Sequence, residues 1–389
     1  MAQADQRLFT VAFVALTVSD LAYFTAAGLV MGVTPFFVTG PLGAGTAGLG
    51  VALGAFSVTT LVLRPVVGRM VDESGRRRLL LAGACLFAVM IAAHLLVEQL
   101  WALIVVRLVL GVAEAMYFVA GFATLSDLAP PGRAGEALSW NSVALYLGIA
   151  AGPGIGQLLM DWRGYGAAWV GGAALALVAA LLVLRVPETW RPAPEDAAPA
   201  PLIHPAVVRP GLALLAGVAA TAGFLALVGL HASEVGFRAW SVVPLVYGGI
   251  VVGCRIVFAR VPDRLPPLRL GAASLSACAL GLLVLAGIPT PVGVLVGAAV
   301  LGFGVAFLTP AIFAAILGVV PAHERGGAAG TATLFMDLGF GGGPLLLGLI
   351  AAGAGIPVAF ASAAALSALA APVLLASAGP IRQGDRNED

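Results

Sequence analysis

The chain has 389 residues, of which 60% are hydrophobic and 10% are charged, and its mean hydropathy is +1.04. Soluble globular proteins are about half apolar and about a quarter charged, so this composition excludes a soluble domain and indicates an integral membrane protein. The formal net charge of +1 points to no class of charged partner.

Twelve apolar runs follow one another along the chain. Most are about 20 residues or longer, the length that a helix needs to cross a hydrocarbon core of about 30 Å. The runs of the first half cover 8–36, 46–68, 79–97, 101–126, 136–159 and 165–184. The runs of the second half cover 210–231, 240–260, 269–288, 291–318, 327–352 and 356–378. Strands of a membrane β-barrel are about ten residues of alternating polarity, so these runs exclude one. We therefore expect an all-α integral membrane protein with twelve transmembrane helices in two six-helix pseudo-symmetric bundles.

A proline-rich polar stretch separates the two halves and cannot continue a helix. We expect an N-terminal bundle at 1–184, a cytoplasmic linker at 185–208 and a C-terminal bundle at 209–389. The chain has no lysine. With a cytoplasmic N-terminus, only Arg163 and Arg238 among the loop arginines fall on the outer side. The positive-inside rule then predicts a multi-pass protein of the cell (cytoplasmic) membrane with both termini in the cytoplasm.

The second half repeats the first at an offset of 191 residues, most clearly in a charged stretch that begins at Arg64 and ends at Arg78. The repeat matches five charged residues of this stretch with Arg255, Arg260, Asp263, Arg264 and Arg269. The same offset aligns Gly148, Gly152 and Pro153 with Gly339, Gly343 and Pro344. Parallel six-span repeats build one large class of secondary transporters, which hold the substrate between the halves near the middle of the membrane.

Three motifs stand in a fixed order along the first half. They are G-R-M-V-D-E-S-G-R-R-R at 68–78, R-L-V-L-G at 107–111 and G-I-A-A-G-P-G-I-G at 148–156. They resemble the loop 2–3 motif, the fourth-span arginine motif and the fifth-span antiporter motif of the major facilitator superfamily. The whole chain resembles the twelve-span bacterial drug and sugar efflux permeases of that superfamily, which are proton antiporters.

In the resembled family, the charged stretch clamps the two halves together in the outward-open state. Carried over to this chain, this conformational latch consists of Arg64, Gly68, Arg69, Asp72, Gly75, Arg76, Arg255, Asp263 and Arg264. The alternative is that the basic residues only fix the topology. The second copy departs from the family pattern, because Ala259 and Pro266 replace its two glycines.

Four ionisable residues inside the predicted spans are candidates for proton coupling, because charge at such depth is costly and faces a cavity or a partner. They are Asp20, Arg107, Glu114 and Asp337. The seven-residue spacing puts Arg107 and Glu114 on one helix face. The resemblance gives Arg107 a role in proton coupling, with Asp20 or Glu114 as the titrating acid. Burial favours a protonated carboxyl and pairing with arginine favours an ionised one, so a motion that changes the pairing acts as a proton switch. The alternative is a static buried ion pair. Asp337 could be a second proton site, a substrate contact or a cap on a broken helix.

Glycine and proline in the fifth and eleventh spans permit a bend and a close approach to a neighbouring helix. These helix-bend residues are Gly148, Gly152, Pro153, Gly156, Gly339, Gly343 and Pro344. Through the resemblance, the motif favours antiport over symport. Aromatic residues of spans that would line a central cavity are candidates for substrate contact, with packing as the alternative. They are Tyr23, Phe24, Tyr117, Phe118, Trp140, Tyr146, Phe224 and Phe335.

The chain has no phosphate-binding loop and no nucleophile or dinucleotide motif in a credible context, so we expect neither ATP-driven transport nor an enzyme. The histidines lack metal-ligand spacing, and we expect no metal and no cofactor. We expect a secondary active transporter that exports a small amphipathic compound, drug or metabolite by proton antiport and alternating access. Its partners would be the small-molecule substrate, protons and the lipid bilayer, without nucleic acid, and the chain would act as a monomer. The alternatives are an importer of a metabolite or sugar, by proton symport or facilitated diffusion, and a sensor or assembly partner that transports nothing.

Overall fold

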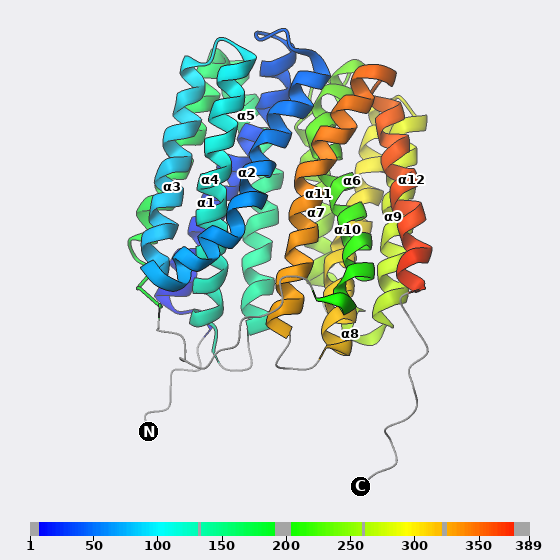
Figure 1. The fold of residues 1–389 in the computed structure, drawn as a ribbon. Coiled ribbons are helices and arrows are strands. Elements are labelled where there is room, and N and C mark those ends of the chain that lie inside the picture. Colours follow the sequence, from blue (N-terminus) through cyan, green and yellow to red (C-terminus); the bar gives the residue numbers. More distant parts are fainter. Residues whose placement is uncertain (1–7, 131–133, 191–203, 259–260, 321–324, 377–389) are drawn as a thin grey trace, which may run out of the picture.

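The computed structural model describes residues 8–130, 134–190, 204–258, 261–320 and 325–376. Within these ranges every regular element is a helix. Figure 1 shows two helical bundles side by side, with α1 to α5 in one and α6 to α12 in the other. Ten helices of the described ranges are long and apolar enough to cross a membrane. The predicted all-α membrane fold is confirmed.

The first bundle consists of five long helices and one short 3₁₀ helix. They are α1 (Val11–Thr39), α2 (Gly45–Ser74), α3 (Arg76–Ala93), η1 (His94–Leu96), α4 (Leu100–Leu128) and α5 (Ala134–Val183). Helix α1 begins where the Thr10 hydroxyl accepts a hydrogen bond from the backbone N–H of Phe13, at 3.2 Å. Such a cap satisfies one of the N–H groups that the first helical turn leaves free.

Helix α5 is a pair of antiparallel segments joined at Arg163 and Gly164, where the backbone leaves the helical region and the glycine takes φ 75°. Before the turn, Gly148 lies against Thr25 of α1. After the turn, the carbonyl oxygen of Ala179 accepts a hydrogen bond from Ser19, also of α1, at 2.9 Å. Positions 148 and 179 therefore lie at similar levels on α1, so α5 crosses the bundle twice, in place of two predicted spans.

The second bundle consists of seven helices and one 3₁₀ turn. They are η2 (Pro205–Val207), α6 (Val208–Glu234), α7 (Val242–Val257), α8 (Val261–Arg264), α9 (Pro267–Gly287), α10 (Pro291–Val319), α11 (Arg325–Ala354) and α12 (Ile356–Leu375). The span predicted at 240–260 is the shorter apolar helix α7, which α8 follows. With the two crossings of α5 and the one of α7, the described helices account for twelve crossings.

The same close helix contact occurs in both bundles, at repeat positions. A Cβ atom on Gly152 of α5 would lie 2.6 Å from the carbonyl carbon of Gly28 in α1, and one on Gly343 of α11 would lie 2.1 Å from the carbonyl oxygen of Ala219 in α6. Gly28 and Ala219 are themselves 191 residues apart. Backbones this close leave room for a hydrogen atom only. These glycines therefore form the contact surface between α5 and α1 and between α11 and α6, and a bend at the motif stays a prediction.

The two bundles also touch each other, along α2 with α11 and along α5 with α7. A Cβ atom on Gly348 would lie 2.8 Å from the Cα of Gly50, and the Gln157 amide nitrogen donates to the carbonyl oxygen of Arg238 at 3.0 Å. These contacts lie toward the end of the bundles at which α1 finishes, which we call the far end. We call the opposite end, where α1 begins, the near end. A cavity between the bundles in the far half has a volume of about 10 Å³, room for one water at most. The bundle interface is therefore closed in this half.

Candidate functional site

Asp20 lies buried within α1 and is held by neutral donors. The Tyr117 hydroxyl of α4 donates to Asp20 Oδ1 at 2.8 Å, and the Asn141 side-chain amide of α5 donates to Oδ2 at 2.7 Å. The Tyr117 oxygen also lies 2.7 Å from that of Ser19. No cation pairs with Asp20 among the described residues, and its exposed fraction is 5%. From the sequence we did not single out Asn141 as a site residue. A polar amide inside an apolar span was the signal that could have identified it.

Glu114 lies in α4, three residues before Tyr117, and faces the same part of the first bundle. Its Oε2 atom is buried and has no hydrogen-bond partner among the described residues. Its polar neighbours within electrostatic range include Tyr23 and the side chains of Arg64 and Asp337. The carboxyl of Glu114 thus lies close to polar and charged side chains from both bundles.

Arg107 does not form an ion pair with Asp20 or with Glu114. It is buried, with an exposed fraction of 5%, and its guanidinium donates to the Thr34 hydroxyl of α1. Seven residues along a helix correspond to a rise of about 10 Å, which separates Arg107 from Glu114 although both lie on one face. The expected proton switch depends on an ion pair between Arg107 and an acid. In this structure Arg107 forms an ion pair with neither Asp20 nor Glu114.

Arg64 and Asp337 form an ion pair that joins the two bundles. The Nε atom of Arg64 in α2 lies 2.8 Å from Oδ2 of Asp337 in α11, and the side chains are 18% and 7% exposed. The guanidinium carbon of Arg64 lies 4.7 Å from the centre of the Phe118 ring. From the sequence we placed Arg64 in the latch. The span that contains Asp337 offered no basic residue as its partner. The two residues are 273 positions apart, so the sequence offered no local signal for their contact.

Arg255 makes the corresponding contact on the other side of the bundle interface. From α7 it donates to the Ser142 hydroxyl at 3.2 Å and to the Tyr146 hydroxyl at 3.4 Å, both in α5. Its guanidinium carbon lies 4.4 Å from the centre of the Tyr146 ring. Arg255 is the repeat equivalent of Arg64, and Tyr146 is the repeat equivalent of Asp337. The two interfaces thus place an arginine at the same position, with different partners.

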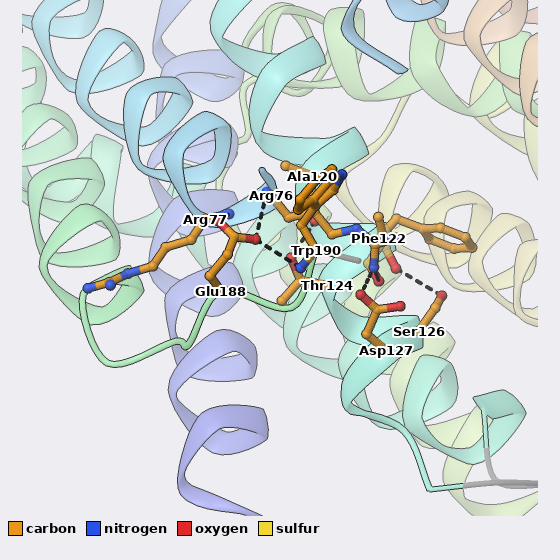
Figure 2. A network of polar contacts seen from close by, with 10 residues as sticks. Arg76, Arg77, Ala120, Phe122, Thr124, Ser126, Asp127, Glu188 and Trp190 are labelled. Carbon is orange, nitrogen blue, oxygen red and sulfur yellow. Dashed lines mark hydrogen bonds and ion pairs between the residues drawn. The ribbon is translucent and has the colours of Figure 1, made fainter. Parts of the chain in front are cut away.

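A second polar network lies at the near end and ties the segment after α5 to the start of α3 (Figure 2). The Glu188 carboxylate accepts hydrogen bonds from the backbone N–H groups of Arg76 and Arg77, at 2.9 and 3.2 Å. The Arg76 side chain forms an ion pair with Asp127 in the last turn of α4 and donates to the Ala123 carbonyl. Sequence reasoning missed both acids, because Glu188 and Asp127 lie far along the chain from the charged motif.

Glu188 is a capping group for α3. Partial burial alone favours its neutral form, but four backbone N–H groups donate to its carboxylate and hold the pKa of Glu188 below its usual range; they belong to Arg76, Trp190, Arg77 and Thr189. The carboxylate also lies at the positive end of the α3 dipole. Gly75, just before α3, has φ 93°, a left-handed conformation that glycine adopts without strain.

For the remaining latch residues, the described part of the structure shows no contact that identifies a role. Gly68 has open space around it, and the side chains of Arg69 and Arg264 are exposed. The side chains of Asp72 and Asp263 lie outside the described part of the structure. The latch function of these residues stays a prediction.

The eight aromatic candidates divide by burial. Four are packed inside the bundles, with exposed fractions of 7% or less: Tyr23, Phe24, Tyr117 and Phe224. The rings of Tyr23 and Tyr117 stack at a centroid distance of 3.8 Å. The other four are partly or largely exposed: Phe118, Trp140, Tyr146 and Phe335. Substrate contact stays a prediction for these residues.

Comparison with known proteins gives a family match along most of the chain. The model of the Major Facilitator Superfamily matches residues 16–300. An uncharacterized MFS-type transporter of Burkholderia mallei (strain SAVP1) is 29% identical over 371 residues, covering 90% of this chain and 87% of the relative. An uncharacterized MFS-type transporter of Salmonella typhimurium is 28% identical over 366 residues, covering 91% and 93%.

Solved structures have the same fold at low sequence identity. The human organic anion transporter MFSD10 (TETRAN) matches with a TM-score of 0.74 and 17% identity, covering 96% of this chain and 100% of that one. A single-residue mutant of the nucleoside transporter NupG matches with a TM-score of 0.75 and 15% identity, covering 95% and 100%. A bacterial homologue of the human lysosomal transporter Spinster, inward-facing and occupied, matches with a TM-score of 0.76 and 14% identity, covering 94% and 96%.

Proposed function

Since the chain belongs to the Major Facilitator Superfamily and is a multi-pass membrane transporter, we propose that it exports a small amphipathic compound by proton antiport. The protein then works in the cell (cytoplasmic) membrane with its near end in the cytoplasm, as the arginine distribution indicates. The two bundles rock against each other and expose a central site alternately to the two sides.

The ion pair of Arg64 with Asp337 carries the proposal. It is a titratable contact between α2 and α11, and these helices belong to different bundles. A proton on Asp337 removes the negative charge and leaves the Arg64 guanidinium without a counter-ion in a partly buried position. Proton binding therefore changes the free energy of the contact between the bundles, and so the balance between conformations with the contact made or broken.

Asp20 and Glu114 supply further proton sites. Asp20 is held by a hydroxyl and an amide, and Glu114 has a buried oxygen without a partner. Neither carboxylate has a cation at ion-pair distance among the described residues, so each can take up a proton without breaking an ion pair. Glu114 lies within electrostatic range of Asp337.

The packing of the bundle interface corresponds to one conformation of a transport cycle. Glycine backbones touch in the far half, and the cavity between the bundles there has a volume of only about 10 Å³. With the near end in the cytoplasm, an exporter takes up its cargo, and an importer releases it, while the far half is closed.

The test needs a ligand and a proton gradient. Amphipathic compounds are first screened for thermal stabilisation of the purified protein at two pH values. A compound that stabilises the protein is then followed in proteoliposomes under an imposed pH gradient. Antiport predicts that the compound moves against its own gradient and opposite to the protons.

The variants Asp337→Asn, Asp20→Asn and Glu114→Gln identify the coupling acid. We expect at least one of them to abolish gradient-driven transport while compound binding persists. The control is Asp161→Asn, because Asp161 is exposed near the turn of α5. Undiminished coupling in all three variants and in the triple variant would contradict the proton assignment. Accumulation in the same direction as the protons would identify a symporting importer instead.

A further inference from the structure

The two interfaces between the bundles differ in charge at repeat positions. At one of them, the carboxylate of Asp337 balances the charge of Arg64. At the other, Arg255 meets the neutral ring and hydroxyl of Tyr146, and no carboxylate pairs with it among the described residues. A partly buried guanidinium between membrane helices favours an anionic partner. Among the described residues, the repeat thus leaves one interface with a positive charge that no carboxylate neutralises.

We propose that Arg255, with Ser142 and Tyr146, binds an oxyanion group of the cargo, so that the cargo is an organic anion. The claim that this anion is transported depends on the function proposed above. The claim that an anion binds here depends only on the contacts of Arg255. The cargo oxyanion takes the place at this interface that the Asp337 carboxylate takes at the other.

The guanidinium group has unused hydrogen-bonding capacity for such a ligand. Of its five N–H donors, one on each terminal nitrogen is used, in bonds of 3.2 and 3.4 Å to hydroxyl groups. The Nε atom is buried and has no partner among the described residues. The guanidinium carbon also lies 4.4 Å from the centre of the Tyr146 ring, a cation–π contact that helps to hold the group in place. An oxyanion that meets the edge of this plane can accept two parallel N–H bonds, the geometry that arginine offers to carboxylates and phosphates.

Arg107, which also lacks a carboxylate partner, does not compete for this role. Arg107 lies inside the first bundle with an exposed fraction of 5%, and its partner Thr34 belongs to that same bundle. Arg255 is partly exposed and lies between the two bundles, in contact with residues of α5. A ligand at Arg255 therefore touches both moving parts, as a transported molecule must.

The test measures binding in detergent, without a proton gradient. The probes are amphipathic carboxylates, sulfonates and phosphate monoesters, each paired with a neutral amide or alcohol of the same skeleton. Thermal unfolding of the purified protein reports their apparent affinities. We expect at least one anion to stabilise the wild type, and its neutral partner to do so at least tenfold more weakly.

Two substitutions of the site separate binding from folding. Arg255→Gln should lower the affinity for the anion at least tenfold and leave that for the neutral partner unchanged. Tyr146→Asp gives Arg255 the internal carboxylate that Arg64 already has. This variant should unfold at the wild-type temperature or above and should lose the response to anions. The control is Arg163→Gln, since Arg163 is exposed at the turn of α5 and stacks on Trp162.

The outcomes are separable. The proposal is overturned if anions stabilise the wild type no better than their neutral partners, if no anion stabilises it, or if Arg255→Gln binds anions as tightly as the wild type. A response to phosphatidylglycerol against phosphatidylcholine in nanodiscs, with none to the soluble anions, would make Arg255 a lipid contact and also overturn it. If the wild type binds anions but shows no proton-coupled transport, only the function proposed above is contradicted.

Discussion

The substitution Gly343→Ala tests whether the glycines of α11 are there for close packing against α6. A Cβ atom at Gly343 would lie 2.1 Å from the carbonyl oxygen of Ala219, whereas one at the neighbouring Gly342 would have nothing within 4 Å. The two positions lie next to each other in one helix. Any gain in helix propensity from alanine is therefore common to both, and the comparison isolates the packing.

The size of the effect follows from this geometry. Ordinary contact distances begin at 3.4 Å, so α6 and α11 must move apart by 3.4 − 2.1 Å, or about 1.3 Å, to accept the methyl group of Gly343→Ala. A backbone carbonyl cannot turn aside as a side chain can. Forcing extra atoms into a packed interior costs about 1–3 kcal/mol. Replacing glycine by alanine within a helix gains up to about 1 kcal/mol. We expect Gly343→Ala to be less stable than Gly342→Ala by about 1–3 kcal/mol.

The assay is thermal unfolding of the purified protein in detergent, followed by tryptophan fluorescence. The repeat supplies a second matched pair. Gly152→Ala would bring a methyl group within 2.4 Å of the α1 backbone, whereas Gly154→Ala would meet only a Leu245 methyl group at 3.7 Å. Melting temperatures that do not differ within either pair would refute the reasoning. Such a result would mean that the helices separate at little cost.

Two further predictions concern the polar networks. Glu188→Gln should lower the melting temperature at pH 7, because a carboxylate at the start of α3 is worth about 1 kcal/mol. The pKa of Glu188 is below its usual range in the folded protein, so its contribution is complete above the ordinary value of about 4.3 and is lost as the pH falls through the lowered value. The difference between wild type and variant should therefore vanish in acid, and a difference that is constant with pH would contradict the capping role. Asn141→Leu removes the donor to Asp20 Oδ2 and should destabilise the protein by about 1–3 kcal/mol in the same unfolding assay. The double variant Asp20→Leu/Asn141→Leu should recover part of this loss, and additive losses would argue against the contact.

Much of the fold follows from local properties of the sequence. A span needs about 20 apolar residues, and a membrane without water leaves a helix as the form that satisfies every backbone group of such a run. The segment from 136 to 184 shows how local this signal is. The sequence predicts two apolar runs, 136–159 and 165–184, with a short break between them. In the structure this break contains the turn at Arg163 and Gly164, where φ 75° suits no side chain well.

The candidate site was only partly accessible from the sequence. Rarity of charge in apolar runs singled out Asp20, Arg107, Glu114 and Asp337, because the cost of burying a charge does not depend on the fold. The family resemblance suggested Asp20 or Glu114 as the acid coupled to Arg107, and neither forms an ion pair with it in this structure. Glu114 shares a helix face with Arg107, but a shared face fixes direction and not distance, and seven residues along a helix are too far apart for an ion pair.

The class of the protein, the helical spans and the duplication at an offset of 191 residues follow from the sequence alone, since each depends on composition or on local spacing. The partners of the charged side chains become visible only in the folded chain. Arg64 pairs with Asp337, and Arg255 with Tyr146, across an interface between helices more than 100 residues apart in the chain. These contacts depend on how two bundles pack, and the packing is set by close backbone approaches such as those of Gly50 with Gly348, which leave no periodic pattern in the chain.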